Sequence, residues 1–209
     1  MRNGLSKVVW AGAALAAGIV FIAAPSASQQ TAALGLGSAR LTLAGTSNIH
    51  AYTATTTAIR VTRVQLGAVP AGATLLDSAL QPGVVEAFEV TIPAASLTSP
   101  KDGLDKNMHA ALKVTEHPDI TFKLLRFEPR PAPATGLRAI GVLRVAGVDR
   151  QVAIDITTER KDATLLVKGT LALLMTDFGV TPPKAMMGML KTDPKVTITF
   201  DVALATNLT

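Results

Sequence analysis

The chain contains no cysteine, only three histidines and few aromatic residues. Without cysteine it can form no disulfide, present no thiol nucleophile and carry no lipid on an N-terminal cysteine. His50, His109 and His117 have neither the i, i+4 spacing of a helical metal pair nor the i, i+2 spacing of a strand pair. Phe, Trp and Tyr make up 4% of the sequence, so that a flat stacking surface for rings is not expected. We therefore predict no metal site and no catalytic cysteine.

Positive charge is in modest excess and is not concentrated in one place. The formal net charge is +5, and about +3 remains when Arg2 and Lys7 are set aside. Lys and Arg form no patch with interleaved aromatic residues, which argues against a nucleic-acid partner. A weak attraction to anionic lipid headgroups is compatible with this balance.

The N-terminal region has the pattern of a secretory signal peptide. Arg2 and Lys7 give a positive start, residues 8–24 are apolar, and small residues continue to Ser28, where we place the cleavage. The alternative is an uncleaved membrane anchor, but the apolar run is short and rich in Ala and Gly. The expected location is therefore the periplasm, or outside the cell. The predicted division is a signal peptide over residues 1–28, a flexible N-terminus over residues 29–38 and a single domain over residues 39–209.

Short stretches of alternating polarity predict a β-rich domain. In residues 195–205, Val196, Ile198 and Phe200 alternate with threonines, the period of a half-buried strand. Residues 146–149 have the composition of a tight hairpin turn. The other predicted strands are residues 40–44, 57–66, 86–92, 119–127, 137–145, 151–158 and 164–175. We therefore expect an all-β fold with one short helix, in which eight antiparallel strands form an extended, closed or nearly closed barrel.

One amphipathic helix interrupts these strands. Leu104, Met108 and Leu112 are four and eight residues apart and share one face of a helix. Pro118 ends this segment, and Ile120 starts the next strand. A lone helix between strands predicts a plug or lid on the sheet.

Six short motifs follow one another along the chain. They are residues 45–50 (GTSNIH), 96–99 (SLTS), 108–113 (MHAALK), 117–122 (HPDITF), 141–148 (GVLRVAGV) and 176–183 (TDFGVTPP). In order and spacing they resemble the YceI-like family of bacterial periplasmic lipid-binding proteins, over about residues 40–204. The resemblance implies a lipocalin-like barrel that holds a polyisoprenoid or similar amphiphilic lipid, or an isoprenoid quinone, with its tail inside.

The implied function is non-covalent sequestration by a protein that is not an enzyme and has no cofactor besides the bound lipid. A homodimer and a transient contact with a membrane surface stay open. Four of the six methionines fall in residues 175–189, and their flexible side chains suit either a lipid tail or a loop that closes the barrel end. The predicted ligand-binding residues are Met108, Leu112, Phe122, Phe178, Met186, Met187, Met189 and Leu190, and the predicted headgroup contacts are Lys113, Lys184 and Lys191.

Two other function classes stay open at this stage. A barrel whose core is filled by side chains could act through its surface in envelope stress or assembly, and an enzyme could act on a lipid or electron-transport substrate. Ser47 and His50 could form a nucleophile and base, but no nucleophile elbow surrounds them. His109 and Asp105 form, on this prediction, a solvated pair on the helix flank. Cavity volume and co-purified lipid distinguish the first alternative from a lipid carrier.

Overall fold

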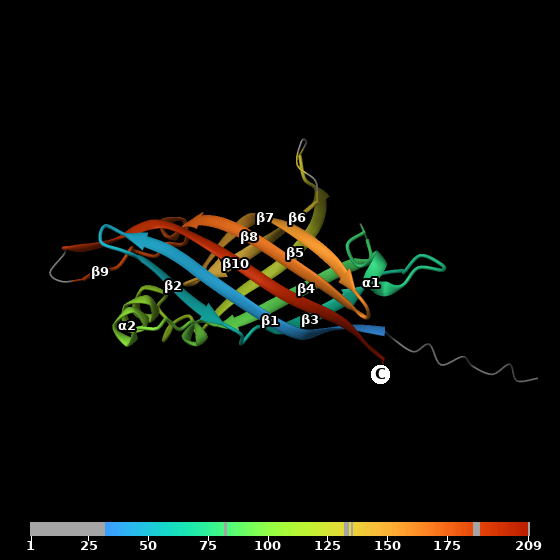
Figure 1. The fold of residues 1–209 in the computed structure, drawn as a ribbon, viewed down its shortest axis with the longest axis horizontal. Helices are drawn as coiled ribbons and strands as arrows, with labels where there is room; N and C mark the ends of the chain where they lie inside the picture. Colours follow the sequence, from blue (N-terminus) through green and yellow to red (C-terminus); the bar gives the residue numbers. More distant parts are fainter. Residues whose placement is uncertain (1–31, 82, 132–133, 135, 186–188, 209) are drawn as a thin grey trace, which may run out of the picture.

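The computed structural model describes residues 32–81, 83–131, 134, 136–185 and 189–208. This part of the chain forms one antiparallel sheet curled into a half-barrel, with a few short helices (Figure 1). The sheet has the order β2-β1-β10-β8-β7-β6-β5-β4-β3, and β9 pairs with β10 outside this order. The strands are β1 (Ala32–Ser47), β2 (Ala51–Thr56), β3 (Arg60–Leu66), β4 (Val85–Pro93), β5 (Asp119–Pro129), β6 (Leu137–Val145), β7 (Val148–Lys161), β8 (Thr164–Leu174), β9 (Lys184–Ala185) and β10 (Leu190–Leu208).

The two edge strands of the curled sheet, β2 and β3, are consecutive in the chain. Residues 57–59 carry the backbone from one edge to the other. The free side of β2 is met by the segment that follows β4: Thr55 N donates to Thr98 O over 2.8 Å, and Thr98 N donates to Thr55 O over 3.0 Å. This bridge satisfies backbone groups that an open edge would leave exposed.

The prediction of eight strands was wrong by one on this path, because β2 was missed. Its buried side chains are Ala54 and Thr56, and neither gives the aliphatic alternation by which the other strands were found. The first strand is also longer than expected. It starts at Ala32, so that residues 32–38, expected to be flexible, pair with the end of β10. The small, Gly-rich composition of this segment predicted flexibility, but its backbone hydrogen bonds to β10 hold it in a strand.

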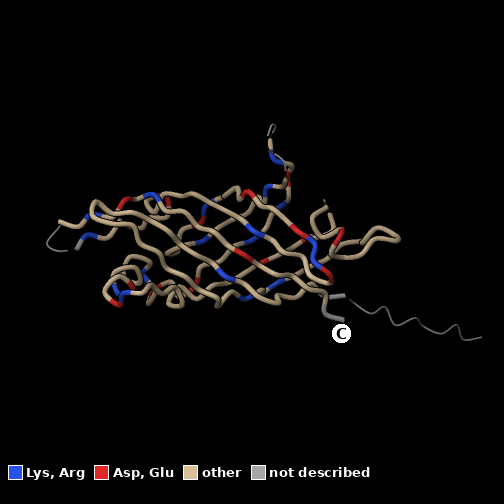
Figure 2. The backbone as a smooth tube through the Cα atoms, viewed as in Figure 1, with Lys and Arg blue, Asp and Glu red and all other residues tan. Residues whose placement is uncertain are grey.

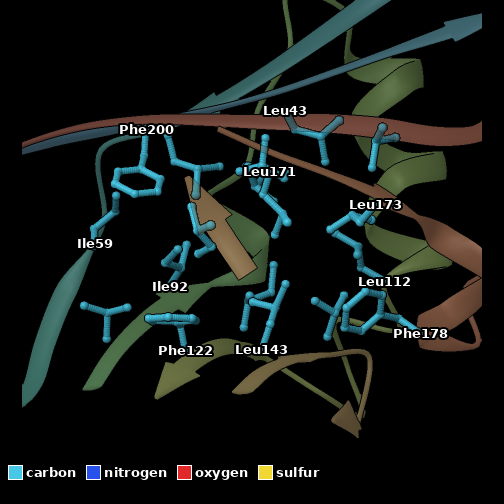
Figure 3. Close-up of a pocket in the computed structure, with 18 of the residues that line it drawn as sticks. Leu43, Ile59, Ile92, Leu112, Phe122, Leu143, Leu171, Leu173, Phe178 and Phe200 are labelled. Atoms are coloured by element: carbon cyan, nitrogen blue, oxygen red, sulfur yellow. The ribbon is translucent and has the colours of Figure 1, made fainter. Parts of the chain in front are cut away.

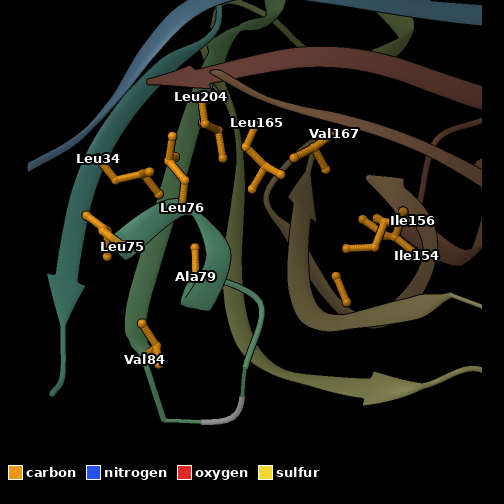
Figure 4. Close-up of a cluster of buried hydrophobic side chains, with 11 residues drawn as sticks. Leu34, Leu75, Leu76, Ala79, Val84, Ile154, Ile156, Leu165, Val167 and Leu204 are labelled. Carbon is orange, nitrogen blue, oxygen red and sulfur yellow. The ribbon is translucent and has the colours of Figure 1, made fainter. Parts of the chain in front are cut away.

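A second helix that the sequence did not establish closes one end of the sheet. In α1 (Leu75–Ser78), Thr74 Oγ1 accepts a hydrogen bond from Asp77 N and caps the first turn. Leu76 packs between Leu34 of β1 and Leu204 of β10, and Leu75 lies beside Leu34 (Figure 4). The further buried members of this cluster are Ala79, Val84, Ala139, Ile154, Ile156, Leu165 and Val167. This end of the molecule is therefore sealed by apolar packing.

The predicted amphipathic helix is present as α2 (Asp102–Ala111), at the opposite end of the sheet from α1 (Figure 1). Met108 is buried and packs, with Leu112, in a cluster that contains Leu97. His109 does not form the expected solvated pair, since its Nε2 lies 2.8 Å from Leu97 O. The carboxylate of Asp105 instead accepts a hydrogen bond from the Ser99 backbone. None of the helices in the described ranges has the length and apolar character needed to cross a bilayer.

Candidate functional site

An apolar cavity of about 540 Å³ lies inside the curled sheet. Side chains from opposite walls point into the same space (Figure 3). Those labelled in the close-up are Leu43, Ile59, Ile92, Leu112, Phe122, Leu143, Leu171, Leu173, Phe178 and Phe200. The volume falls within the range of about 300–1,000 Å³ that is usual for small-molecule sites.

The sheet is a half-barrel and not the closed or nearly closed barrel that was expected, and its interior is not filled by its own side chains. Leu171, Ile198 and Phe200 point inward, yet they are only half-buried because their inner surfaces face the cavity. A close-packed core would bury such side chains almost completely. The alternative of a filled core, left open by the sequence, is therefore not supported by this geometry.

Two aromatic rings lie flat against the sheet because glycine stands beneath each of them. Phe200 of β10 pairs directly with Gly169 of β8, and Phe122 of β5 lies over Gly141 of β6. A Cβ atom added at either glycine would overlap the ring. The absence of these two Cβ atoms keeps both rings against the wall and leaves the middle of the cavity open.

The cavity opens at the end where α2 lies. Among the lining residues in the described ranges, the exposed ones are His50, Lys101, Gly103 and Asn107. All four belong to α2, the residue before it, or the turn between β1 and β2. The opposite end is closed by the apolar cluster around α1 (Figure 4). The cavity is thus a one-ended pocket with a polar mouth and an apolar floor.

The turn between β1 and β2 is held in place by two side chains. Ser47 Oγ accepts hydrogen bonds from the backbone N–H groups of Ile49 and His50 and donates to His50 O over 2.8 Å. Asn48 Nδ2 donates to Met189 O, and Asn48 Oδ1 accepts from Lys191 N, both over 2.8 Å. Ser47 therefore shapes a turn, and no interaction joins its hydroxyl to the His50 ring among the described contacts. The turn is fastened to the start of β10.

Tyr52 lies near the mouth of the cavity and contributes a phenol group. Its ring lies against Gly45 of β1 and lines the cavity. Burial raises the pKa of the Tyr52 phenol above its ordinary value, and the charge of Asp193 raises it further. The phenol is therefore neutral at physiological pH and can both donate and accept a hydrogen bond. In the described ranges, no group of three or more His, Cys, Asp or Glu side chains is arranged to hold a metal ion.

The structure brings together five of the eight predicted ligand-binding residues. Met108, Leu112, Phe122, Phe178 and Leu190 all line the cavity. Met189 does not line it and is 65% exposed, while Met186 and Met187 lie outside the described residues. The predicted headgroup contacts Lys113, Lys184 and Lys191 are exposed and are not among the lining residues.

The polar residues of the mouth were missed by sequence reasoning. His50, Tyr52, Lys101, Asn107 and Thr192 come from four separate segments that meet only in the folded chain. Their one signal in the sequence is that His50 ends the GTSNIH motif.

The match to known families agrees with this architecture. Residues 45–204 match the model of the YceI-like domain. The chain belongs to the YceI-like family. The resemblance found in the sequence is thereby confirmed. Among the curated proteins, none matches this YceI-like chain.

Solved structures similar to this YceI-like protein share its fold at low sequence identity. BcnA of Burkholderia cenocepacia is 16% identical with a TM-score of 0.60, and the match covers 79% of this chain and 95% of BcnA. A domain of Saccharophagus degradans, described as polyisoprenoid-binding and implicated in plant cell wall breakdown, is 13% identical with a TM-score of 0.58, over 84% of this chain and 99% of that one. A mutant YceI protein of Campylobacter jejuni is 16% identical with a TM-score of 0.50, over 71% and 81%.

Several motifs of this YceI-like chain have structural roles around the cavity. Thr56 Oγ1 lies 2.7 Å from Ser96 Oγ, which donates to Pro93 O, so that the SLTS motif fastens the segment before α2 to β2. Gly179 ends the 3₁₀ turn η2 (Met175–Phe178) in a left-handed conformation and leaves Phe178 buried beside the cavity. The hairpin turn predicted over residues 146–149 is present but shorter, since Val145 pairs with Val148 and only residues 146–147 lie outside the strands.

Proposed function

We propose that this protein binds an amphiphilic lipid of the polyisoprenoid type, with the tail in the cavity and the head at the polar mouth. An isoprenoid quinone belongs to the same class. Binding is sequestration without covalent chemistry. The proposed place of action is the periplasm, after removal of a signal peptide near Ser28.

The observation that carries this proposal is the size of the apolar cavity. Core mutations that leave a cavity cost about 24 cal/mol for each Å³. Because the cavity of about 540 Å³ opens to solvent at its mouth, only the direction of this effect carries over: an empty apolar cavity of this size is costly to the fold. A protein with this cavity therefore gains greatly from an apolar occupant.

The lining favours a flexible aliphatic chain over a flat ring system. Leucine, isoleucine and valine contribute most of the wall, and Phe122 and Phe200 lie against the sheet where they cannot clamp a ring from two sides. The floor at α1 offers no charged or polar lining group in the described ranges. An apolar tail that enters first, with its polar end last, fits this gradient.

The polar mouth suits a small head that forms hydrogen bonds. Tyr52 is a neutral phenol, Asn107 offers an amide and Lys101 offers a positive charge. The Saccharophagus degradans domain with the same fold is described as polyisoprenoid-binding, which supports the same ligand class here.

The first test is native mass spectrometry of the protein secreted by its own host and purified without detergent. The expected result is a bound species that organic solvent releases and whose mass corresponds to a long apolar chain. The protein stripped of this species should then bind a fluorescent prenol. A protein that carries no lipid and binds no prenol after stripping would overturn the proposal.

A matched pair of variants tests whether the ligand lies inside the cavity. Leu171 and Leu174 lie on the same strand, β8, but Leu171 lines the cavity whereas Leu174 faces outward and is 42% exposed. In Leu171→Gln an amide without a partner enters the apolar space, at a cost of about 1–3 kcal/mol to a bound tail. Prenol affinity should fall about tenfold in this variant and stay unchanged in Leu174→Gln. Equal effects would place the ligand elsewhere.

A further inference from the structure

Two large apolar side chains stand exposed beside the mouth of the cavity. Ile49, at the turn between β1 and β2, is 59% exposed, and Met189, just before β10, is 65% exposed. The two segments are joined by the hydrogen bond from Asn48 Nδ2 to Met189 O. In the described part of the chain these are the two most exposed large hydrophobic residues. Each is adjacent in the chain to a residue that lines the cavity, His50 or Leu190, so both lie beside the mouth.

Two positive charges accompany them. Lys184 of β9 and Lys191 of β10 are directly opposite one another in the antiparallel pair, and both are exposed. Like charges at such positions repel and destabilise a two-stranded ribbon. Neither lysine forms a salt bridge to a described residue, and the carboxylate of the nearby Asp193 accepts a hydrogen bond from Lys195 N. An external anion would relieve this repulsion.

We propose that Ile49, Met189, Lys184 and Lys191, here called the rim, dock the protein on the surface of an anionic lipid bilayer. This inference rests on the proposed function, because a tail that crosses water between bilayer and cavity loses about fourfold in equilibrium constant for each exposed methylene. Direct contact of the mouth with the bilayer removes that barrier. The two apolar side chains enter the interface, while the two lysines attract the headgroups. Figure 2 shows positive residues on the hairpin that projects at this end of the molecule.

The test is co-sedimentation of the mature protein with vesicles of equal parts phosphatidylglycerol and phosphatidylcholine, at low salt. The wild type should sediment with these vesicles and much less with phosphatidylcholine alone. The double variant Ile49→Asp, Met189→Asp should lose about tenfold or more in partitioning. The matched control is Leu125→Asp, since Leu125 is 52% exposed but lies on β5, away from the rim. Equal loss in the control and the double variant would overturn the proposal.

The charge contribution is measured with a second pair of variants. Lys184→Glu, Lys191→Glu should lose about fivefold in partitioning for each lysine on anionic vesicles, and nothing on phosphatidylcholine alone. The control Lys161→Glu, Lys168→Glu carries the same change in net charge on β7 and β8. If both double variants lose the same amount, net charge and not the rim is responsible, and the proposal fails.

Ligand binding in the cavity and docking of the rim on a bilayer are distinguished by the way the lipid is delivered. A fluorescent prenol is offered either from a cyclodextrin complex or from the anionic vesicles. Ile49→Asp should take up the prenol from cyclodextrin as the wild type does, but more slowly from vesicles. If the wild type binds no prenol from cyclodextrin, the proposed function fails. If it binds prenol but does not sediment with vesicles, only the rim proposal fails.

Discussion

Single residues determine how wide the cavity is. The rings of Phe122 and Phe200 would reach into the interior from most strand positions, but each has a glycine beneath it on the neighbouring strand. If the proposed function holds, Gly169 and Gly141 contribute to ligand binding without contacting the ligand, because they leave room for the two rings at the wall. Glycine in a strand weakens pairing and packs no side chain, so its presence at two wall positions has a cost that an open cavity explains.

The variant Gly169→Ala tests this account at one position. Its Cβ would push the Phe200 ring into the cavity, so that prenol affinity should fall about tenfold. The free energy of unfolding should fall by about 1–3 kcal/mol, because the added methyl group overpacks the wall. The second substitution Phe200→Leu, added to Gly169→Ala, should restore affinity because the ring is gone. Gly37→Ala is the control, since its Cβ would lie 3.5 Å from Ala203 O in ordinary contact. Fluorescent prenol titrations beside melting curves measure both quantities, and no rescue by Phe200→Leu would refute the account.

At the scale of elements, Asn48 connects the turn between β1 and β2 to the start of β10. Both its amide atoms are used, with one bond to Met189 O and one from Lys191 N. Asn48→Ala should remove both bonds, at about 0.5–1.5 kcal/mol each, and Asn48→Asp should retain only the acceptor. Hydrogen exchange at the Lys191 amide should therefore speed up in Asn48→Ala and much less in Asn48→Asp. Equal protection in all three proteins would show that the turn and β10 are held together by other contacts.

The pair of β6 and β7 carries a charge cluster whose effect depends on pH. The Arg138 guanidinium, hydrogen-bonded to Asp155 over 2.7 Å, holds the pKa of that carboxyl below its ordinary value, and the charge of Arg130 adds to this. Because the folded pKa is lowered, the stabilisation is present above the ordinary aspartate pKa and is lost as the pH falls through the folded value.

The difference in unfolding free energy between the wild type and Asp155→Asn should therefore be largest near neutral pH and should vanish in strong acid. Asp201→Asn is the control, because Asp201 lies 3.8 Å from Lys168 with both side chains more than 60% exposed, and such surface pairs contribute little. Urea unfolding at a series of pH values measures both. A difference that grows in acid would contradict the assignment.

The sequence predicted elements better than it predicted the site. The period of two in β10 and the stripe of Met108 and Leu112 in α2 identify their elements because each places large apolar side chains on one face. In β2 the inward positions are Tyr52, Ala54 and Thr56, so that burial there comes from neighbours in space and leaves no local pattern. The polar mouth was unpredictable for the same reason, since its residues meet only through long-range strand pairing.

At the scale of the whole molecule, the two ends of the sheet differ in kind. The α1 end is closed by a continuous apolar cluster, while the α2 end combines exposed polar lining with the rim (Figures 1 and 4). A ligand in such a cavity has one orientation available, because its polar group can be hydrated or hydrogen-bonded at one end only. The fixed depth between the mouth and the floor at α1 then limits how much tail is withdrawn from water.

This geometry predicts how affinity depends on tail length. Each additional methylene that enters the cavity should strengthen binding from water by about 0.8 kcal/mol, up to the length that reaches the floor at Ala79 and Leu80. Longer prenols should gain nothing further, since the extra units remain at the mouth. At a concentration one hundred times the dissociation constant, a ligand should stabilise the fold by about 2.7 kcal/mol, which for a chain of this size raises the melting temperature by roughly 5–10 °C.

The measurement is a series of prenols with increasing tail length and one common head, followed by thermal shift and titration from cyclodextrin. In Ala79→Phe the larger side chain makes the cavity shallower. The affinity should therefore reach its plateau at a shorter tail, and the affinity of the shortest prenols should stay unchanged. Ala172→Phe on the exposed face of β8 is the matched control and should leave the plateau in place. A plateau that ignores Ala79→Phe would mean that the tail does not reach α1, and a steady gain with no plateau would mean that the cavity does not end there.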